Sequence, residues 1–273
     1  MNRSIRDLLL LFPRGGFKPT DIAGCLLWLR SDRGLFTDAA MTTPSVNDGD
    51  AVQAWADQSG NGNNFTQATA GKIPTLQNAA ADVIADKGVV RFNGTSDLLV
   101  ASNFTSVMQG TVFAAFRMNG LVNSHTILAS SDEVAALNYV RIRSVHSTLN
   151  PSMSVLQRDG APAYDGGYGN TALVVATPYV GAWSSNGIAY SLRLNGTIQT
   201  LTFVSGANTG DWFGDTSGRD NFTVGGMRRD VDADFLMGDL CEVIMYDATL
   251  SPGQIVQVHK YLAKRWGIAL AMN

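Results

Sequence analysis

The chain has 273 residues, of which 45% are hydrophobic and 16% charged, and its formal net charge at pH 7 is −3. A chain of this length buries about three quarters of its unfolded surface, so it needs neither a metal nor a disulfide to hold a core. The acidic balance argues against a nucleic-acid surface, and no apolar run approaches the ~20 residues of a membrane-spanning helix.

The first element is a short helix predicted for residues 4–12, which Ser4 can cap and Pro13 ends. Its apolar side chains are the candidate partner-binding residues Ile5, Leu8, Leu9, Leu10, Leu11 and Phe12. They cover more of the helix than one supporting surface would need. The helix therefore either docks on its own domain or is buried in a neighbouring subunit. We expect residues 1–16 to form an N-terminal arm and 17–273 to form one domain.

The same segment does not resemble a signal peptide, because its apolar core is shorter than the ~7 to 15 residues of such a peptide. We therefore expect the protein to be made and retained in a cytoplasm. Cys25 and Cys241 are then expected to be reduced thiols. Since they lie on the first and last predicted strands, which we expect to be neighbours, a disulfide between them is the alternative.

From residue 17 to 246, short β-favouring runs alternate with turn residues. The predicted strands are 25–29, 88–92, 111–117, 139–143, 173–175, 188–194, 222–225 and 240–246. In the run from Ile188, every second residue is apolar up to Leu194. Asn195-Gly196 then supplies the positive φ of a tight hairpin. This pattern predicts an all-β sandwich or barrel.

The C-terminus changes to helical periodicity. Ser251 and Gln254 form a capping box around Pro252, which suits the first helical position. The predicted buried face of this helix carries Ile255, Val258, Leu262 and Trp266. One helix is therefore expected to close the domain.

Four blocks carry a resemblance to a known fold. They are FKPTDIAGCLLWLRSD (17–32), AWADQSGNGNNFTQ (54–67), VVRFNGTSDLLV (89–100) and GDLCEVIMYDATLSPGQIVQVHKYLAKRWGI (238–268). In order and spacing they resemble the concanavalin A-like, laminin G-like jelly rolls of bacterial surface proteins and bacteriophage virion proteins. The resemblance implies an all-β, antiparallel two-sheet jelly-roll sandwich and leaves the function open.

Within these blocks the residues have structural interpretations. Asp57 is placed to hydrogen-bond back into the turn that follows it, and Asp97 is placed to tie the turn at Asn93. Trp28 and Trp55 are bulky enough to lie between the sheets.

Catalytic patterns are weak. The enzymes of the resembling fold are glycoside hydrolases that use paired carboxylates, and the nearest pair here is Asp239 with Glu242. A spacing of three on an alternating strand places them on opposite faces. His125 and His146 are scattered, and His259 is expected to be a partly exposed helix residue. The sequence therefore predicts that the protein is not an enzyme.

No cofactor is required by the sequence, and calcium is the metal to test because hard oxygen ligands are plentiful. One candidate set is Asp57, Asn61 and Asn63; the other is Asp230, Asp232 and Asp234. The alternatives are a self-capped turn for the first set and a solvated loop neutralised by nearby arginines for the second.

Loop aromatics are the remaining candidates. Tyr164, Tyr168, Trp212 and Phe213 could bind a glycan ring, form a protein interface or anchor their own loops. We predict a non-enzymatic virion structural protein, either a capsid decoration or a tail-associated component. Its expected partners are other virion proteins and copies of itself. The alternative is a carbohydrate-binding, lectin-like adhesion module, and a glycoside hydrolase is the third interpretation.

Overall fold

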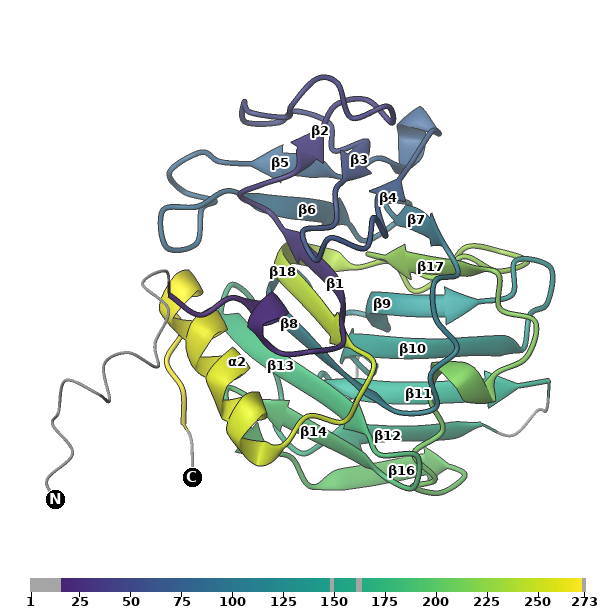
Figure 1. The fold of residues 1–273 in the computed structure, drawn as a ribbon. Coiled ribbons are helices and arrows are strands. Elements are labelled where there is room, and N and C mark those ends of the chain that lie inside the picture. Colours follow the sequence, from purple (N-terminus) through teal and green to yellow (C-terminus); the bar gives the residue numbers. More distant parts are fainter. Residues whose placement is uncertain (1–15, 148–149, 161–163, 272–273) are drawn as a thin grey trace, which may run out of the picture.

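The protein is described by a computed structural model that covers residues 16–147, 150–160 and 164–271. Two antiparallel sheets stack face to face, and one α-helix, α2, lies on the outside (Figure 1). The all-β two-sheet sandwich expected from the sequence is confirmed. No helix in these ranges is both long and apolar enough to cross a membrane.

The eight-stranded sheet has β18 near its centre, and β1 (Cys25–Arg30) pairs with β18 beside the main path. Along that path the order is β15 (Thr197–Ile198), β14 (Tyr190–Leu194), β13 (Pro178–Ser185), β8 (Gly110–Met118), β18 (Met237–Tyr246), β6 (Val89–Asn93) and β5 (Thr75–Gln77).

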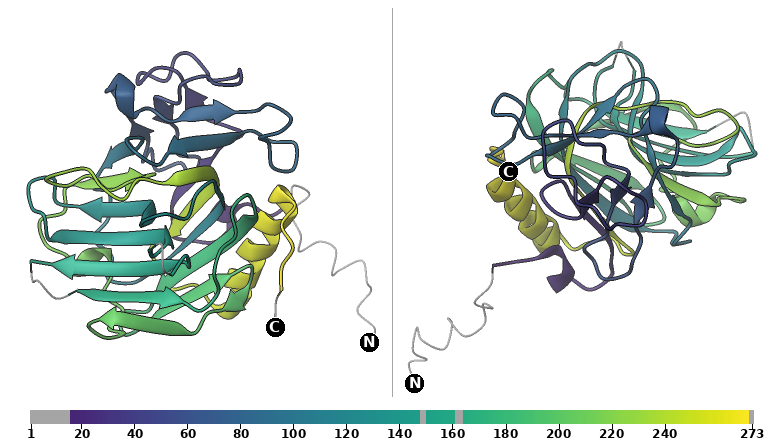
Figure 2. Two further views of the ribbon diagram at one scale, coloured as in Figure 1. Left: turned by 180° about the vertical axis from the view of Figure 1, so that it is seen from behind. Right: turned by 90° about the horizontal axis from the view of Figure 1, so that it is seen from above.

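The ten-stranded sheet forms the other layer and presents its long strands face on in Figure 2 (left). Its order is β16 (Leu201–Ser205), β12 (Asp165–Gly169), β11 (Ser154–Asp159), β10 (Asn138–Val145), β9 (His125–Ser131), β17 (Asn221–Val224), β7 (Leu99–Ser102), β4 (Phe65–Thr66), β3 (Ala54–Trp55) and β2 (Leu35–Phe36). Short 3-10 turns lie at η2 (Pro19–Asp21), η3 (Ala70–Lys72) and η4 (Phe213–Asp215).

Every predicted strand overlaps an observed one except 173–175, which lies in the loop before β13. Leu173 is buried there as a loop anchor, and its backbone N–H donates to Pro151 O over 2.7 Å. Ile188 also lies outside β14 and is exposed, whereas the apolar residues from Tyr190 to Leu194 are buried as expected.

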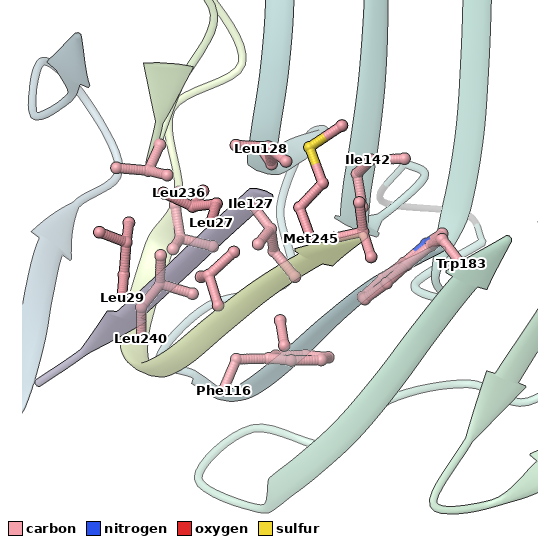
Figure 3. Close-up of a cluster of buried hydrophobic side chains, with 14 of the residues drawn as sticks. Leu27, Leu29, Phe116, Ile127, Leu128, Ile142, Trp183, Leu236, Leu240 and Met245 are labelled. Carbon is pink, nitrogen blue, oxygen red and sulfur yellow. The ribbon is translucent and has the colours of Figure 1, made fainter. Parts of the chain in front are cut away.

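The main core lies between the sheets, where leucines and aromatic rings of both layers interdigitate (Figure 3). Trp55 lies in this core with no exposed surface, as expected. Trp28 does not, because Leu27 and Leu29 on either side of it point inward and a strand alternates its faces. Trp28 instead packs on the outer face of the eight-stranded sheet, beneath α2.

Helix α2 (Pro252–Trp266) forms as predicted, with Ser251 as N-cap and Gly267 as a left-handed C-cap. Its predicted apolar face is buried against the eight-stranded sheet. His259 was expected to be partly exposed but is fully buried, with its ring 5.3 Å from that of Phe113.

The cysteines are free thiols, as expected, and the disulfide alternative is wrong. Cys25 pairs with Tyr246 at one end of the β1–β18 ladder, whereas Cys241 precedes Glu242, the partner of Arg30 at the other end. The two side chains therefore lie at opposite ends of the paired segment.

Candidate functional site

The outer faces of the two sheets carry different side chains. The eight-stranded sheet is covered on its outer face by α2 and a second apolar cluster. The ten-stranded sheet carries arginine, hydroxyl and tyrosine side chains at the corresponding position, on β9 to β12. Among the described residues, this outer face carries more polar and charged side chains than the face covered by α2. The candidate site therefore lies on the ten-stranded sheet.

A cross-strand row forms the centre of this face. The strand register places Arg143 of β10 opposite Thr126 of β9 and Ser154 of β11, and Ser154 opposite Tyr168 of β12. Residues directly opposite in an antiparallel pair point to the same face. A bulge at Ile127 turns both Ile127 and Leu128 toward the core, which leaves Thr126 in the outward-facing row (Figure 3).

A second row lies beside the first, with Arg141 opposite Ala129 and Leu156, and Leu156 opposite Gly166. Tyr164 packs over Gly166, where an added Cβ would lie 2.9 Å from its ring. Gly166 is therefore required for this tyrosine to reach the sheet. The two rows form one cluster, which we call the arginine–tyrosine face: Thr126, Tyr139, Arg141, Arg143, Ser154, Tyr164 and Tyr168.

Arg143 is the most buried cation of the arginine–tyrosine face, with 2% of its surface exposed. Its Nη2 contacts His146 Nδ1 at 2.9 Å, and Nη1 lies 3.4 Å from Ser124 Oγ. The His146 ring stacks on Tyr168 with centroids 4.8 Å apart. Burial, together with the neighbouring Arg141, lowers the pKa of Arg143 to about 9, so it is still protonated at neutral pH.

Arg141 differs from Arg143 because it has a charged partner. Its guanidinium pairs with the Asp234 carboxylate and lies 4.9 Å from the centre of the Tyr139 ring. In the described ranges no carboxylate lies within ion-pair distance of Arg143. Asp234 raises the pKa of Arg143 only through space, as a smaller effect than burial. The face therefore has one positive charge that no neighbouring carboxylate neutralises.

A cleft of about 610 Å³ opens at the end of the sheet beside these arginines. Its wall includes Asn123, Ser124, Ser147, Asp234 and Phe235. His125 lies in the same wall and is 3% exposed, and its Nε2 has no hydrogen-bond partner among the described residues. The lining of the cleft thus includes the aromatic residue Phe235 and several polar residues.

The four aromatic residues that the sequence offered as candidates fall into two pairs, which lie in different places in the structure. Tyr164 and Tyr168 meet on the arginine–tyrosine face and are half-buried. Trp212 and Phe213 are fully buried in the main core, where their rings are 5.0 Å apart. The last two are loop anchors rather than a binding surface, because their side chains fill the interior. The arm candidates, Ile5, Leu8 to Leu11 and Phe12, lie outside the described residues.

The first calcium candidate is a closed turn. The Asp57 carboxylate accepts from the backbone N–H groups of Trp28, Ser59 and Asn63. The Asn61 and Asn63 amides donate to carbonyl oxygens of β1, the latter to Leu26 O over 2.8 Å. The side chains hold the loop onto the strand, so they do not converge as metal ligands.

The second calcium candidate is dispersed over three ion pairs. Asp230 pairs with Arg229, Asp232 with Lys72, and Asp234 with Arg141. Each carboxylate points to a different cation, which prevents a shared cation site. Within the described ranges no cluster of three or more acidic, histidine or cysteine side chains suits a metal.

The carboxylate pair considered for hydrolysis lies on one face, contrary to the prediction. An extra residue at Cys241 forms a bulge in β18, so Asp239 and Glu242 both point to the outer face. Asp239 is paired with Arg91 and Arg117. The two carboxylates are thus on the same side but held by separate partners.

Glu242 is buried and accepts hydrogen bonds from three side chains. Trp28 Nε1 and Tyr261 Oη donate to its Oε1 over 2.5 and 2.8 Å, and Trp266 Nε1 donates to Oε2 over 2.9 Å. Arg265 adds an ion pair at 3.2 Å. This carboxylate joins α2 to the sheet and has a structural role.

A second hollow, of about 490 Å³, is lined by acidic residues that include Asp159, Asp165, Asp211 and Asp215. Asp165 and Asp211 both contact Thr209 Oγ1, at 3.1 and 2.9 Å. Burial raises the pKa of Asp211. Asp165 also accepts from Ala207 N, and Asp215 from Trp212 N, so these carboxylates hold the loop that carries Trp212 into the core.

Sequence reasoning missed Arg141, Arg143 and the cleft beside them. The sequence did contain a pattern that could have revealed them. These arginines alternate with Val140 and Ile142, in a strand whose two faces are both buried. An arginine on a covered strand face is unusual and marks a possible site. His125 and His146, taken as scattered, meet at the same end of the β9–β10 pair.

Comparisons with known proteins bear on the fold. No family model and no curated protein matches the chain. Among solved structures, domain 4 of AbnA, a GH43 extracellular arabinanase from Geobacillus stearothermophilus in complex with arabinotriose, is similar, with 14% identity and a TM-score of 0.55. The match covers 78% of this chain and 100% of that domain. This likeness shows the concanavalin A-like jelly-roll sandwich.

Two further structures are similar over less of the chain. CBM40 of the Ruminococcus gnavus IT-sialidase, bound to alpha2,3 sialyllactose, is 15% identical with a TM-score of 0.48; the match covers 56% of this chain and 84% of that one. The K499G mutant of NanB sialidase from Streptococcus pneumoniae is 15% identical with a TM-score of 0.46, and the match covers 61% and 26% of the two chains. The virion role stays a prediction.

Proposed function

We propose that the protein is a non-catalytic carbohydrate-binding module that holds a saccharide in the cleft beside the arginine–tyrosine face. The observation that carries the proposal is the lining of that cleft. The lining includes the half-buried aromatic residue Phe235 together with the polar residues Asn123, Ser124 and Asp234. Saccharide sites combine an aromatic surface with a few polar groups in this way.

Two further observations support this proposal. The sandwich is of the same type as an arabinanase domain whose structure holds arabinotriose. The outer face of the eight-stranded sheet is instead covered by α2 and its apolar cluster. The proposal makes saccharide binding, which was the alternative at the level of sequence, the main function.

A glycan array tests the proposal directly. The labelled protein should bind a restricted set of glycans, and Phe235→Ala should abolish the binding. Phe17→Ala is the matched control, because Phe17 is a half-buried phenylalanine that packs on Tyr261 beside α2. We expect this control to keep the array signal. No glycan bound above background, or an unchanged signal in Phe235→Ala, would contradict the proposal.

The same array tests calcium and catalysis. The side chains of both calcium candidates already form turn hydrogen bonds or ion pairs. The protein should therefore bind the same glycans with calcium and with a chelator. Incubating each bound glycan with the protein should leave it intact. Product formation by the wild type, lost in a folded Asp239→Asn or Glu242→Gln variant, would contradict the non-catalytic proposal and favour the glycoside hydrolase.

The second proposed function is the assembly role in a virion, as a capsid decoration or tail-associated component. One observation favours an assembly surface: a groove of about 510 Å³ runs along α2 between Phe17, Tyr261 and Lys264. Gly16, the last residue of the predicted arm, is part of its lining. Light scattering should show an oligomer for the full chain and a folded monomer after deletion of residues 1–16. A full chain that is monomeric at all concentrations would contradict this proposal.

A further inference from the structure

The charges around the cleft do not cancel. Asp234 lies in its wall, but Arg141 pairs with this carboxylate, so their charges offset each other. Burial lowers the pKa of His125, and burial lowers that of His146 to about 4, so both rings are neutral at pH 7. Arg143 is left as the uncompensated charge among the described groups that face this end of the sheet.

Polar atoms without partners lie in the same row as Arg143. Among the described residues, Thr126 Oγ1, Arg143 Nε and Ser154 Oγ are all buried without a hydrogen-bond partner. These residues lie directly opposite one another on β9, β10 and β11. Buried polar atoms are nearly always paired in folded proteins, so three in one row require an explanation.

The arrangement is costly for a purely structural element. A buried cation without a counter-charge destabilises a fold by several kcal/mol, and an apolar residue of similar size would remove that cost. On the same outer face, Ala129 and Leu156 of the next row are buried apolar side chains, so this face accommodates them. A ligand that supplies the negative charge would account for the arginine.

The contacts of Arg143 connect it to the cleft. Its Nη1 lies 3.4 Å from Ser124 Oγ and 3.3 Å from His146 O, and Ser124 in turn donates to His146 O over 2.7 Å. Ser124 and Ser147, which follows His146, both line the cleft. The guanidinium therefore lies directly behind the wall formed by these two serines.

We propose that the saccharide bound in this cleft is anionic, carrying a carboxylate or a sulfate, and that Arg143 determines this specificity. The inference rests on the proposed function and deepens it. Arg143 supplies the positive potential from behind the wall, while Ser124, Ser147 and His125 are polar residues of the wall itself. At an effective dielectric constant near 20, one such charge about 6 to 12 Å away changes affinity by about 10- to 100-fold.

Calorimetric titration with two matched sets of glycans tests this inference. The first set is lactose, 3′-sialyllactose and 3′-sulfolactose, which share one scaffold and separate carboxylate from sulfate. The second is trigalacturonate and its neutral methyl ester. In at least one set an acidic member should bind at least 10-fold more tightly than its neutral counterpart. Equal or tighter binding of the neutral members in both sets would overturn the inference.

Variants assign the preference to a residue. Arg143→Gln should reduce the ratio of acidic to neutral affinity to about 1, and Arg143→Lys should retain part of it because the charge is kept. Arg33→Met removes the same charge at an exposed position and should leave the ratio unchanged. An unchanged ratio in a folded Arg143→Gln variant would also overturn the inference.

The outcomes separate this inference from the function on which it rests. Neutral glycans bound on the array and lost in Phe235→Ala, with no preference for acidic members, would retain the carbohydrate-binding module and reject the role of Arg143. An array with no bound glycan would reject both. Thermal unfolding of each variant shows whether it is folded before its affinity is interpreted.

Discussion

Each outer face of the sandwich buries one charged side chain, but the two side chains differ in their partners. Glu242, beneath α2, accepts from two indoles and a tyrosine and pairs with Arg265. Arg143, on the ten-stranded sheet, has no carboxylate partner among the described residues. A fully partnered buried charge stabilises the fold, whereas an uncompensated one is better explained by binding.

The two faces should differ most in how much stability is lost when the buried charge is removed. Glu242→Gln places amide hydrogens against indole and phenol donors and leaves Arg265 without this partner. We expect a loss of about 3 to 5 kcal/mol in the free energy of unfolding, measured by urea denaturation. Glu133→Gln is the control, because Glu133 forms an exposed ion pair with Arg228 and should cost under about 1 kcal/mol. Equal losses in both variants would refute the structural role of Glu242.

The helix-covered face should also respond to acid. Burial lowers the pKa of His259 to about 4, whereas the unfolded chain titrates near 6.5. Between these values the unfolded state binds more protons, so stability falls as pH drops from about 6.5 to 4, by on the order of 3 kcal/mol. His259→Gln should flatten this part of the stability–pH curve. A curve of unchanged slope in that variant would show that the histidine is not buried as described.

A smaller effect is expected at the start of α2. Ser251→Ala removes the side chain that accepts from Gln254 N, and should cost about 1 kcal/mol of unfolding free energy. Ser251→Asp, which can still cap the helix, should restore most of it. Both variants should keep the glycan profile of the wild type, since α2 covers the other sheet. An altered glycan profile would contradict the claim that glycan binding does not depend on the face covered by α2.

The smallest effect on stability is expected at Arg143. Arg143→Met removes an uncompensated buried cation, so the free energy of unfolding should stay within about 1 kcal/mol of the wild type or rise. A loss of 3 kcal/mol or more in urea denaturation would show that Arg143 stabilises the fold as Glu242 does. The contrast between the two faces would then disappear.

The parts of the fold that sequence could predict are local. Helix α2 follows from Ser251, Pro252 and the spacing of its apolar residues, all of which act within a few residues. The hairpin at Asn195 follows from one dipeptide with positive φ. Alternation places Trp28 and Leu27 on opposite faces of their strand, but it does not say which face is the interior. Trp28 was predicted to lie between the sheets and lies on the outer face.

The parts that sequence could not predict depend on register and bulges. The bulge at Cys241 puts Asp239 and Glu242 on one face of the sheet. No residue type at this position predicts a bulge. The row through Arg143 needs the pairing of β10 with both β9 and β11, which is set by contacts distant in sequence. For Trp212 the sequence left glycan binding, a protein interface and loop anchoring open, and the structure shows an aspartate of its own loop holding it in the core.

Hydrogen exchange with a bound glycan tests the central claim most directly. In the presence of the best glycan from the array, protection should increase in 122–125, 141–147 and 234–235 and stay unchanged in 252–266. Protection confined to 252–266, or none in the three cleft segments, would contradict the assignment of binding to the ten-stranded sheet.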